Sequence, residues 1–406
     1  MKNFIIFSIY LLFSLSACNS GNIVATTSNQ VNNVAEIVID KGPDSLPESR
    51  ATTNILYTTI RVCSPGSITN CLSIDHVLLD TGSTGLRIIN SNAIDALRLP
   101  RMLYNESLVN ECTSFPRGYV WGSINYADVY WAHEIAPNIT LQIIANTTAP
   151  VPSSCLDFSP PNPIHTVSEL RANAIMGIGN MVYDKESDVL GIESSGAGYY
   201  SCSNNSCSHI NIPDTSQVSN IIAQFKDKTV TNGYLIQLPE VLESYTDILK
   251  GQIVFGLNTK SNNQISTQAK IFRAMPLGYI TTIYANQVKF GLFDSGTNSI
   301  KVTSNTDPVI PVIHGELFPS TPIMLTAQLA DFAFAEPFYN LSDVNFMLIS
   351  NQQVKPVLPY VGTYGGFSEF LWGIPFFIGK NVYFGINKAT VNNESTPFVG
   401  YSSYYP

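Results

Sequence analysis

The sequence has few charged residues and no excess of basic ones. Of its 406 residues 13% are charged, and 30 acidic residues outnumber 21 basic ones to give a formal net charge of −9. A nucleic-acid-binding protein presents a basic surface, which this composition does not supply, so we expect no nucleic acid partner. For the same reason we expect a substrate that is not acidic.

Metal-binding and nucleophile motifs are also missing from the sequence. None of the five histidines stands at ligand spacing from another, and His133-Glu134 lacks the second histidine of a zinc-binding helix. No Gly-x-Ser-x-Gly elbow surrounds a serine, and no histidine stands with a serine or cysteine in a recognisable nucleophile setting. We therefore expect neither a metal nor another cofactor.

Long apolar runs are scarce, and the clearest one lies at the amino terminus. Lys2 precedes an apolar run from Phe4 to Leu15 that is too short to span a membrane. The following Leu15-Ser16-Ala17-Cys18 fits a lipobox, although an ordinary secretory signal with a chance cysteine is the alternative. The sequence predicts a signal peptide over residues 1–17, a lipid-modified Cys18 and a place in the bacterial cell envelope, at the outer membrane or the periplasmic face. Membrane contact is expected through this anchor alone.

The segment after Cys18 has no aromatic anchors and no periodic pattern. It is rich in Asn, Ser, Thr and Val, which predicts a flexible tether over residues 18–50. From residue 51 on, runs rich in β-branched and apolar residues alternate with turn residues, so the class is mainly β. One helix is expected from Ser216, with Val218, Ile221, Ile222 and Phe225 on one face.

Six cysteines remain once Cys18 is set aside. In an oxidising compartment an even number predicts up to three disulfides, among fifteen connectivities. Cys63 and Cys71 flank a turn and can face each other across a hairpin, and Cys202 and Cys207 flank a polar loop. Cys112 and Cys155 then remain.

Two short motifs, one in each half of the chain, carry the chemistry. Leu78 to Ser83 and Leu292 to Thr297 each read as two apolar residues, an aspartate, a small hydroxyl residue, a glycine and another hydroxyl residue. One copy would suit an ordinary Asx turn. Each copy is followed downstream by an apolar-apolar-Gly strand, ending at Gly177 or Gly373, so the chain reads as two similar halves, residues 51–215 and 216–406. Two such turns that meet would bring Asp80 and Asp294 together as an acid/base pair.

These residues resemble a known family, the pepsin-like bilobal aspartic proteases. Over roughly residues 55 to 405 the resemblance implies two related β lobes with a cleft between them, and catalytic Asp80 and Asp294. It implies that Gly82 and Gly296 let the turns approach closely, that Thr81 and Ser295 lock them together, and that Ser83 and Thr297 orient the carboxylates. The chain also resembles a family of bacterial secreted proteins that share the Cys63-Cys71 hairpin and the Asp-Thr-Gly-Ser turn.

A hairpin from Gly118 through Tyr130 to Ile144 matches the flap of that family at Tyr119, Trp121, Gly122 and Ser123. The resemblance makes Tyr119 a lid over the substrate, whereas the pattern by itself favours aromatics packed in a sheet core. The family usually has tryptophan where Arg87 stands. We expect Arg87 either to donate to the Tyr119 hydroxyl or to favour ionised carboxylates.

The resulting expectation is a monomeric aspartic endopeptidase that hydrolyses a polypeptide substrate with a water activated between two aspartates. The alternative is a catalytically inactive pepsin-like envelope lipoprotein that binds peptide or glycan.

Overall fold

The computed structural model describes residues 33–156, 162–185, 197–203, 206–302, 310–350, 355–365, 369–387, 389–391, 394–395 and 397–404. Two large sheets account for nearly all of the strands in these residues, and the fold is mainly β as predicted. The predicted signal peptide and Cys18 lie outside the described residues. No helix in the described part of the chain is long and apolar enough to cross a membrane.

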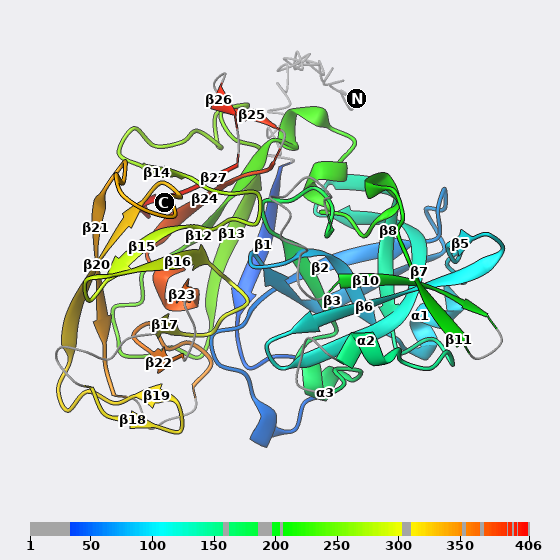
Figure 1. The fold of residues 1–406 in the computed structure, drawn as a ribbon, viewed down its shortest axis with the longest axis horizontal. Helices are drawn as coiled ribbons and strands as arrows, with labels where there is room; N and C mark the ends of the chain where they lie inside the picture. Colours follow the sequence, from blue (N-terminus) through cyan, green and yellow to red (C-terminus); the bar gives the residue numbers. More distant parts are fainter. Residues whose placement is uncertain are drawn as a thin grey trace, which may run out of the picture. The chain divides into compact units, whose positions relative to one another are not determined.

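The larger sheet has sixteen strands, drawn from both halves of the chain, in the order β11-β10-β6-β7-β8-β4-β9-β3-β2-β1-β13-β12-β24-β27-β14, with β5 paired to β6 (Figure 1). Its strands are β1 (Val34–Ile39), β2 (Leu56–Cys63), β3 (Cys71–Asp80), β4 (Thr84–Ile89), β5 (Leu103–Tyr104), β6 (Ser107–Phe115), β7 (Gly118–Trp131), β8 (Glu134–Ile144), β9 (Ala174–Ile178), β10 (Ala197–Ser203), β11 (Ser206–Ile210), β12 (Gly233–Leu238), β13 (Leu249–Phe255), β14 (Lys270–Arg273), β24 (Lys380–Gly385) and β27 (Phe398–Ser403).

The second sheet has nine strands, all from the second half of the chain, in the order β18-β19-β22-β17-β23-β16-β15-β20-β21. They are β15 (Ile280–Tyr284), β16 (Gln287–Phe293), β17 (Ile300–Val302), β18 (Val312–Ile313), β19 (Glu316–Leu317), β20 (Ile323–Ala330), β21 (Ser342–Leu348), β22 (Gly362–Tyr364) and β23 (Glu369–Trp372). A separate pair joins β25 (Thr390–Val391) to β26 (Glu394–Ser395). The strands after residue 216 therefore divide between the two large sheets.

Helices in the described residues are short. The α-helices are α1 (Asn92–Ala96), α2 (Ser153–Leu156), α3 (Val167–Leu170) and α4 (Ile374–Phe377), and the 3-10 turns are η1 (Glu48–Arg50), η2 (Asp214–Ser216), η3 (Ile222–Gln224) and η4 (Lys228–Val230).

The predicted tether is wrong where the chain forms β1. Residues 34–39 pair with β13 over six positions and with β2 at Val38 and Ile39, so the blue strand β1 lies between β2 and the green strand β13 (Figure 1). Ala35, Ile37 and Ile39 are buried, in the alternation of a strand with one face on the core. This strand joins the first half of the chain to the second through backbone hydrogen bonds.

The helix predicted from Ser216 is also wrong. Ser216 ends the turn η2, and only residues 222–224 form another single turn, η3. The predicted apolar residues Val218, Ile221, Ile222 and Phe225 are all buried. The Asn220 amide donates to Gly179 O and its oxygen accepts the Ile222 N–H, so side-chain hydrogen bonds replace helical ones here.

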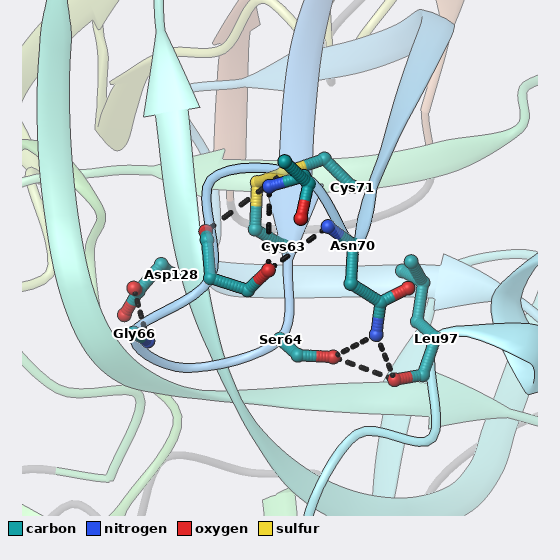
Figure 2. Close-up of a disulfide and its surroundings, with 9 residues drawn as sticks. Cys63, Ser64, Gly66, Asn70, Cys71, Leu97 and Asp128 are labelled. Carbon is teal, nitrogen blue, oxygen red and sulfur yellow. Dashed lines mark hydrogen bonds between the residues drawn. A yellow bond between two sulfur atoms is a disulfide. The ribbon is translucent and has the colours of Figure 1, made fainter.

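All three predicted disulfides are present: Cys63–Cys71, Cys112–Cys155 and Cys202–Cys207. Figure 2 shows the first, which joins β2 to β3 across the tip of their hairpin. Beside it the Ser64 hydroxyl donates to Leu97 O at 2.6 Å, and Gly66 N–H donates to Asp128 Oδ2 at 2.8 Å (Figure 2). The hairpin that leads into Asp80 is thus fastened to its neighbours at its far end.

Candidate active site

Asp80 is presented by three strands of the larger sheet. It is the last residue of β3 and is 6% exposed. Strand β9 runs parallel to β3, with Gly177 beside Asp80, and antiparallel to β4, which leaves the turn after Asp80. A Cβ atom on Gly177 would lie 2.5 Å from Thr84 N, so this glycine lets the turn pass directly over β9.

Asp294 is presented in the same way by the second sheet. It follows β16, and its N–H donates to Trp372 O at 3.0 Å. Strand β23 runs parallel to β16 and antiparallel to β17, as β9 does with β3 and β4. A Cβ atom on Gly373 would lie 2.1 Å from Ser299 O. The two halves therefore build their aspartate turns on one plan, and the apolar-apolar-Gly strands form the centre of each.

The two turns are hydrogen-bonded to each other through their small hydroxyl residues. Thr81 N–H donates to Ser295 Oγ at 3.0 Å, and Ser295 N–H donates to Thr81 Oγ1 at 2.9 Å. Each hydroxyl also donates across to the strand of the other half, Thr81 to Phe293 O and Ser295 to Leu79 O, both at 2.7 Å. Both residues are buried, so the relative position of the turns is fixed by four hydrogen bonds that water does not weaken.

Each carboxylate is oriented by its own turn. Gly82 N–H donates to Asp80 Oδ1 at 2.8 Å and the Ser83 hydroxyl to Asp80 Oδ2 at 2.6 Å. Gly296 N–H and the Thr297 hydroxyl donate to Asp294 Oδ1 and Oδ2 at 2.8 and 2.5 Å. One oxygen of each aspartate thus accepts a backbone N–H and the other a hydroxyl.

The two carboxyl groups lie within hydrogen-bond distance of each other. A Cβ atom on Gly82 would stand 2.7 Å from Asp294 Oδ1, and one on Gly296 would stand 2.5 Å from Asp80 Oδ1. Glycine is therefore required at both positions, since any side chain would enter the space that the opposite carboxyl group occupies.

Burial and, next in size, the charge of the neighbouring Asp80 together raise the pKa of Asp294 to about 7. The Thr297 hydroxyl and Gly296 N–H stabilise the ionised form and oppose this shift. Two carboxyl groups this close repel each other when both are ionised, so a raised pKa of Asp294 is the shift expected of a pair that shares a proton. Aspartic proteases are the reference case for two carboxyl groups that share a proton.

A tyrosine and a glutamate that the sequence patterns did not single out lie near Asp294. The Tyr279 hydroxyl donates to Glu369 Oε1 at 2.8 Å. Burial raises the pKa of Tyr279, as do the charges of Glu369 and Asp294. The one available signal was Glu369 itself, a charged residue that starts the apolar strand leading to Gly373.

The predicted flap residues are placed in a packed sheet. Tyr119 is 7% exposed, its ring meets the His165 ring edge-on at 5.7 Å, and its backbone bonds to Asn162 and Ile164. Trp121 is buried beside Tyr200 and donates to Ala149 O. Gly122 and Ser123 lie within the ladders that β7 forms with β6 and β8. This environment is the sheet-core alternative that the pattern by itself favours.

The expected contact between Arg87 and Tyr119 is absent from the described residues, and the prediction is wrong. Every guanidinium nitrogen of Arg87 has another acceptor: Thr113 Oγ1 for Nε, Thr84 O and Gly85 O for Nη1, and Glu111 and Asp184 for Nη2. No donor remains for Tyr119. Arg87 is also not among the groups that act on the pKa of Asp294.

No group of three or more metal-ligating side chains gathers in the part of the chain that the structure describes. A family model described as "Protein of unknown function (DUF3443)" matches residues 29–401. The chain belongs to this DUF3443 family. No curated protein matches the chain. For this DUF3443 member the match includes both aspartate turns, both glycine-ended strands and every cysteine except Cys18.

Proposed function

We propose that the chain is an aspartic-type endopeptidase with Asp80 and Asp294 as its catalytic pair. The observation that carries the proposal is the pair itself: two carboxyl groups that face each other on two equivalent turns, which Thr81 and Ser295 lock together. A structural Asx turn needs no second turn against it. Two turns built to hold two carboxyl groups in contact, at the cost of mutual repulsion, are typical of acid/base chemistry.

In the proposed reaction the ionised Asp80 acts as general base. It takes a proton from a water molecule, whose oxygen attacks the carbonyl carbon of the peptide bond. The protonated Asp294 donates a hydrogen bond to the carbonyl oxygen as negative charge develops there. The amine nitrogen then takes a proton from the pair, the C–N bond breaks, and the pair returns to its singly protonated state. No covalent intermediate with the protein is formed.

The pKa of Asp294 sets the pH range of this mechanism. Because its proton is lost as the pH rises through about 7, the active form is present below neutral pH. The proposal includes an extended, largely apolar polypeptide as substrate, and a monomer held at the bacterial cell envelope by a lipid on Cys18.

The test is digestion of a reduced, unfolded protein by the purified chain across pH 3 to 8. We expect cleavage that declines above pH 7, and none with Asp80→Asn or Asp294→Asn. Asp95→Asn, at an exposed position on α1, is the matched control and should cleave like the wild type. Equal inactivity of wild type and both dyad variants, with all three folded, would refute the peptidase.

A binding protein without catalysis is the second candidate. It is favoured by the buried setting of Tyr119, because the residue expected to cover a substrate packs instead into the sheet. A labelled peptide library should then bind wild type and Asp294→Asn alike and be recovered uncut. Cleavage by the wild type alone excludes this reading.

A further inference from the structure

Arg87 lies in β4 at the centre of a buried polar cluster. Its side chain is 1% exposed, and Nη2 donates to Glu111 Oε1 at 2.7 Å and to Asp184 Oδ2 at 2.8 Å. Glu111 comes from β6, and Asp184 precedes β10 in the chain. The Tyr199 hydroxyl, from β10, donates to Asp184 Oδ1 at 2.7 Å and accepts Val218 N–H at 2.8 Å. Segments from β4, β6 and the chain around Asp184 thus meet at one guanidinium group, and Tyr199 joins β10 to it through Asp184.

The charges in this cluster do not balance unless a proton is added. One guanidinium nitrogen, Arg87 Nη2, faces two buried carboxyl groups, so a single positive charge stands opposite two acids. If both acids were ionised, the site would hold a buried negative charge without a partner, which is costly. Glu111 Oε2 is buried and has no N–H or hydroxyl partner among the described residues. A proton on the pair would satisfy it and leave one negative charge opposite Arg87.

The surroundings of the two carboxyl groups differ in how they favour a proton. Burial and the charge of Glu111 raise the pKa of Asp184. Burial acts the same way on Glu111, but the charge of Arg87 and the hydrogen bonds to Asp184 and Thr113 outweigh it and lower the pKa of Glu111. Among the described residues, the main groups that act on this pair are Arg87, Tyr199 and Thr113, with the two carboxyl groups themselves.

The same guanidinium group holds the backbone that leaves the Asp80 turn. Arg87 Nη1 donates to Thr84 O at 2.7 Å. Thr84 follows Ser83, whose hydroxyl donates to Asp80 Oδ2 at 2.6 Å and whose carbonyl accepts Gly179 N–H at 2.7 Å. Any movement of Arg87 therefore reaches the catalytic carboxylate through two covalently adjacent residues.

We propose that Arg87 is a positioning residue for Asp80, and that Glu111 and Asp184 hold it in place as a carboxyl pair that shares one proton. The positioning role rests on the proposed peptidase function, whereas the shared proton does not. The cluster is thus a second acid pair in the chain, with a structural use in place of a catalytic one.

The shared proton is tested by amide substitutions followed by chemical denaturation. Glu111→Gln and Asp184→Asn should each fold with modest loss, because the remaining carboxylate still neutralises Arg87. The double variant leaves Arg87 without a counter-charge, so its loss should far exceed the sum of the two single losses, or it should not fold at all. Additive losses, or single variants more stable than the wild type at pH 7, would overturn the shared proton.

A second measurement counts the proton directly. The measurement uses the Asp294→Asn variant, in which the Asp80–Asp294 pair no longer takes up a proton of its own. In this variant, unfolding releases the proton held by Asp184. The equilibrium constant of unfolding should rise about tenfold per pH unit once the pH exceeds about 4, the ordinary pKa of an aspartate in an unfolded chain. Adding Asp184→Asn should abolish that slope. Equal slopes with and without Asp184 would refute the assignment.

The positioning role is tested by comparing two variants. Arg87→Met/Glu111→Gln removes one positive and one negative charge together and loses the hydrogen bond from Arg87 to Thr84 O, whereas Glu111→Gln keeps that hydrogen bond. We expect kcat to fall about 10- to 100-fold only in the double variant, with KM little changed. Val344→Ala, a core variant in β21, controls for lost stability. If the wild type cleaves nothing, the positioning role can still be tested by following the carboxyl ¹³C NMR signals of Asp80 and Asp294 as the pH changes. The titration of these two carboxyl groups should shift in Arg87→Met/Glu111→Gln and stay unchanged in Glu111→Gln. Identical titrations in the two variants would overturn the role.

Discussion

Thr81 and Ser295 are hydrogen-bonded to each other in both directions, each through its backbone N–H and the other's hydroxyl oxygen, at 3.0 and 2.9 Å. The two residues are equivalent positions in the two halves of the chain. Each hydroxyl also donates a hydrogen bond to the carbonyl oxygen of the residue that precedes the opposite aspartate. The link between the two carboxyl groups is therefore made by the neighbouring residues, which leaves the carboxyl groups free to exchange a proton.

Thr81→Val should break this link with almost no change of shape. The substitution leaves Ser295 N–H buried without an acceptor and removes a donor to Phe293 O, so we expect a loss of about 2–3 kcal/mol of unfolding free energy. Urea denaturation measures it. Thr81→Ser, which keeps the hydroxyl, is the control and should lose much less. A loss in Thr81→Val no larger than in the control would contradict the role of the link.

The stability of the protein should fall as the pH rises from about 4 to 7. Burial and the Asp80 charge raise the pKa of Asp294 from 3.8 to about 7, so the folded state holds a proton that the unfolded state has lost over this interval. The stabilisation is complete below the unfolded pKa and disappears as the pH passes the folded one, by at most about 4 kcal/mol. Denaturation midpoints across pH 4 to 8 measure it. Asp294→Asn should remove this part of the slope; an unchanged slope would place the proton elsewhere.

Gly82→Ala and Gly296→Ala should each separate the aspartate pair. A methyl group at either position would stand 2.7 or 2.5 Å from an oxygen of the opposite carboxyl group. We expect peptide hydrolysis to be lost and the pKa of Asp294 to move toward its ordinary value, measured by carboxyl ¹³C NMR. Gly66→Ala is the control, since its φ of +77° makes alanine strained although nothing lies within 4 Å. It should cost about 1 kcal/mol and leave the pair unchanged.

Tyr119→Phe distinguishes a lid from a core residue. Tyr119 packs in a buried cluster with Trp121 and the Cys112–Cys155 disulfide, so we expect the phenylalanine variant to keep kcat and KM. Tyr119→Ala should instead lose about 3–5 kcal/mol of stability through the cavity it leaves. A large fall in kcat for Tyr119→Phe at unchanged stability would instead support the prediction that Tyr119 covers the substrate.

His76 should add a smaller pH dependence at higher pH. The hydrogen bond to Asp40 raises the pKa of His76 against the opposing effect of burial, and Asp75 Oδ2 lies 2.9 Å from Nδ1. Its stabilisation is complete below pH 6.5 and disappears as the pH rises through the folded pKa. Because the partners are partly exposed, we expect less than about 1 kcal/mol. The difference in unfolding free energy between wild type and His76→Gln should be larger at pH 5 than at pH 9. An equal difference at both pH values would contradict the contribution of His76.

Several elements were predictable because their signals are local. Apolar runs bounded by turn residues predicted a mainly β chain, and the hairpin predicted from Gly118 to Ile144 is formed by β7 and β8. The spacing of Cys63 to Cys71 and of Cys202 to Cys207 predicted two disulfides, whereas the structure was needed to show that the remaining Cys112 and Cys155 pair with each other. β1 was missed because its six residues sit in a polar, Asn-rich context, and their partners in β13 lie more than two hundred residues away.

The sequence by itself determined the two aspartate turns, because an aspartate, a small hydroxyl residue and a glycine after an apolar strand specify their own conformation. Only the tertiary structure decided that Arg87 turns away from Tyr119 to Glu111 and Asp184, and that Tyr119 lies in a core. A buried guanidinium group must find carboxylates wherever the fold brings them, and these come from strands and loops that no local pattern connects. The motif fixed where the carboxyl groups are, and the packing of distant segments decided what surrounds them.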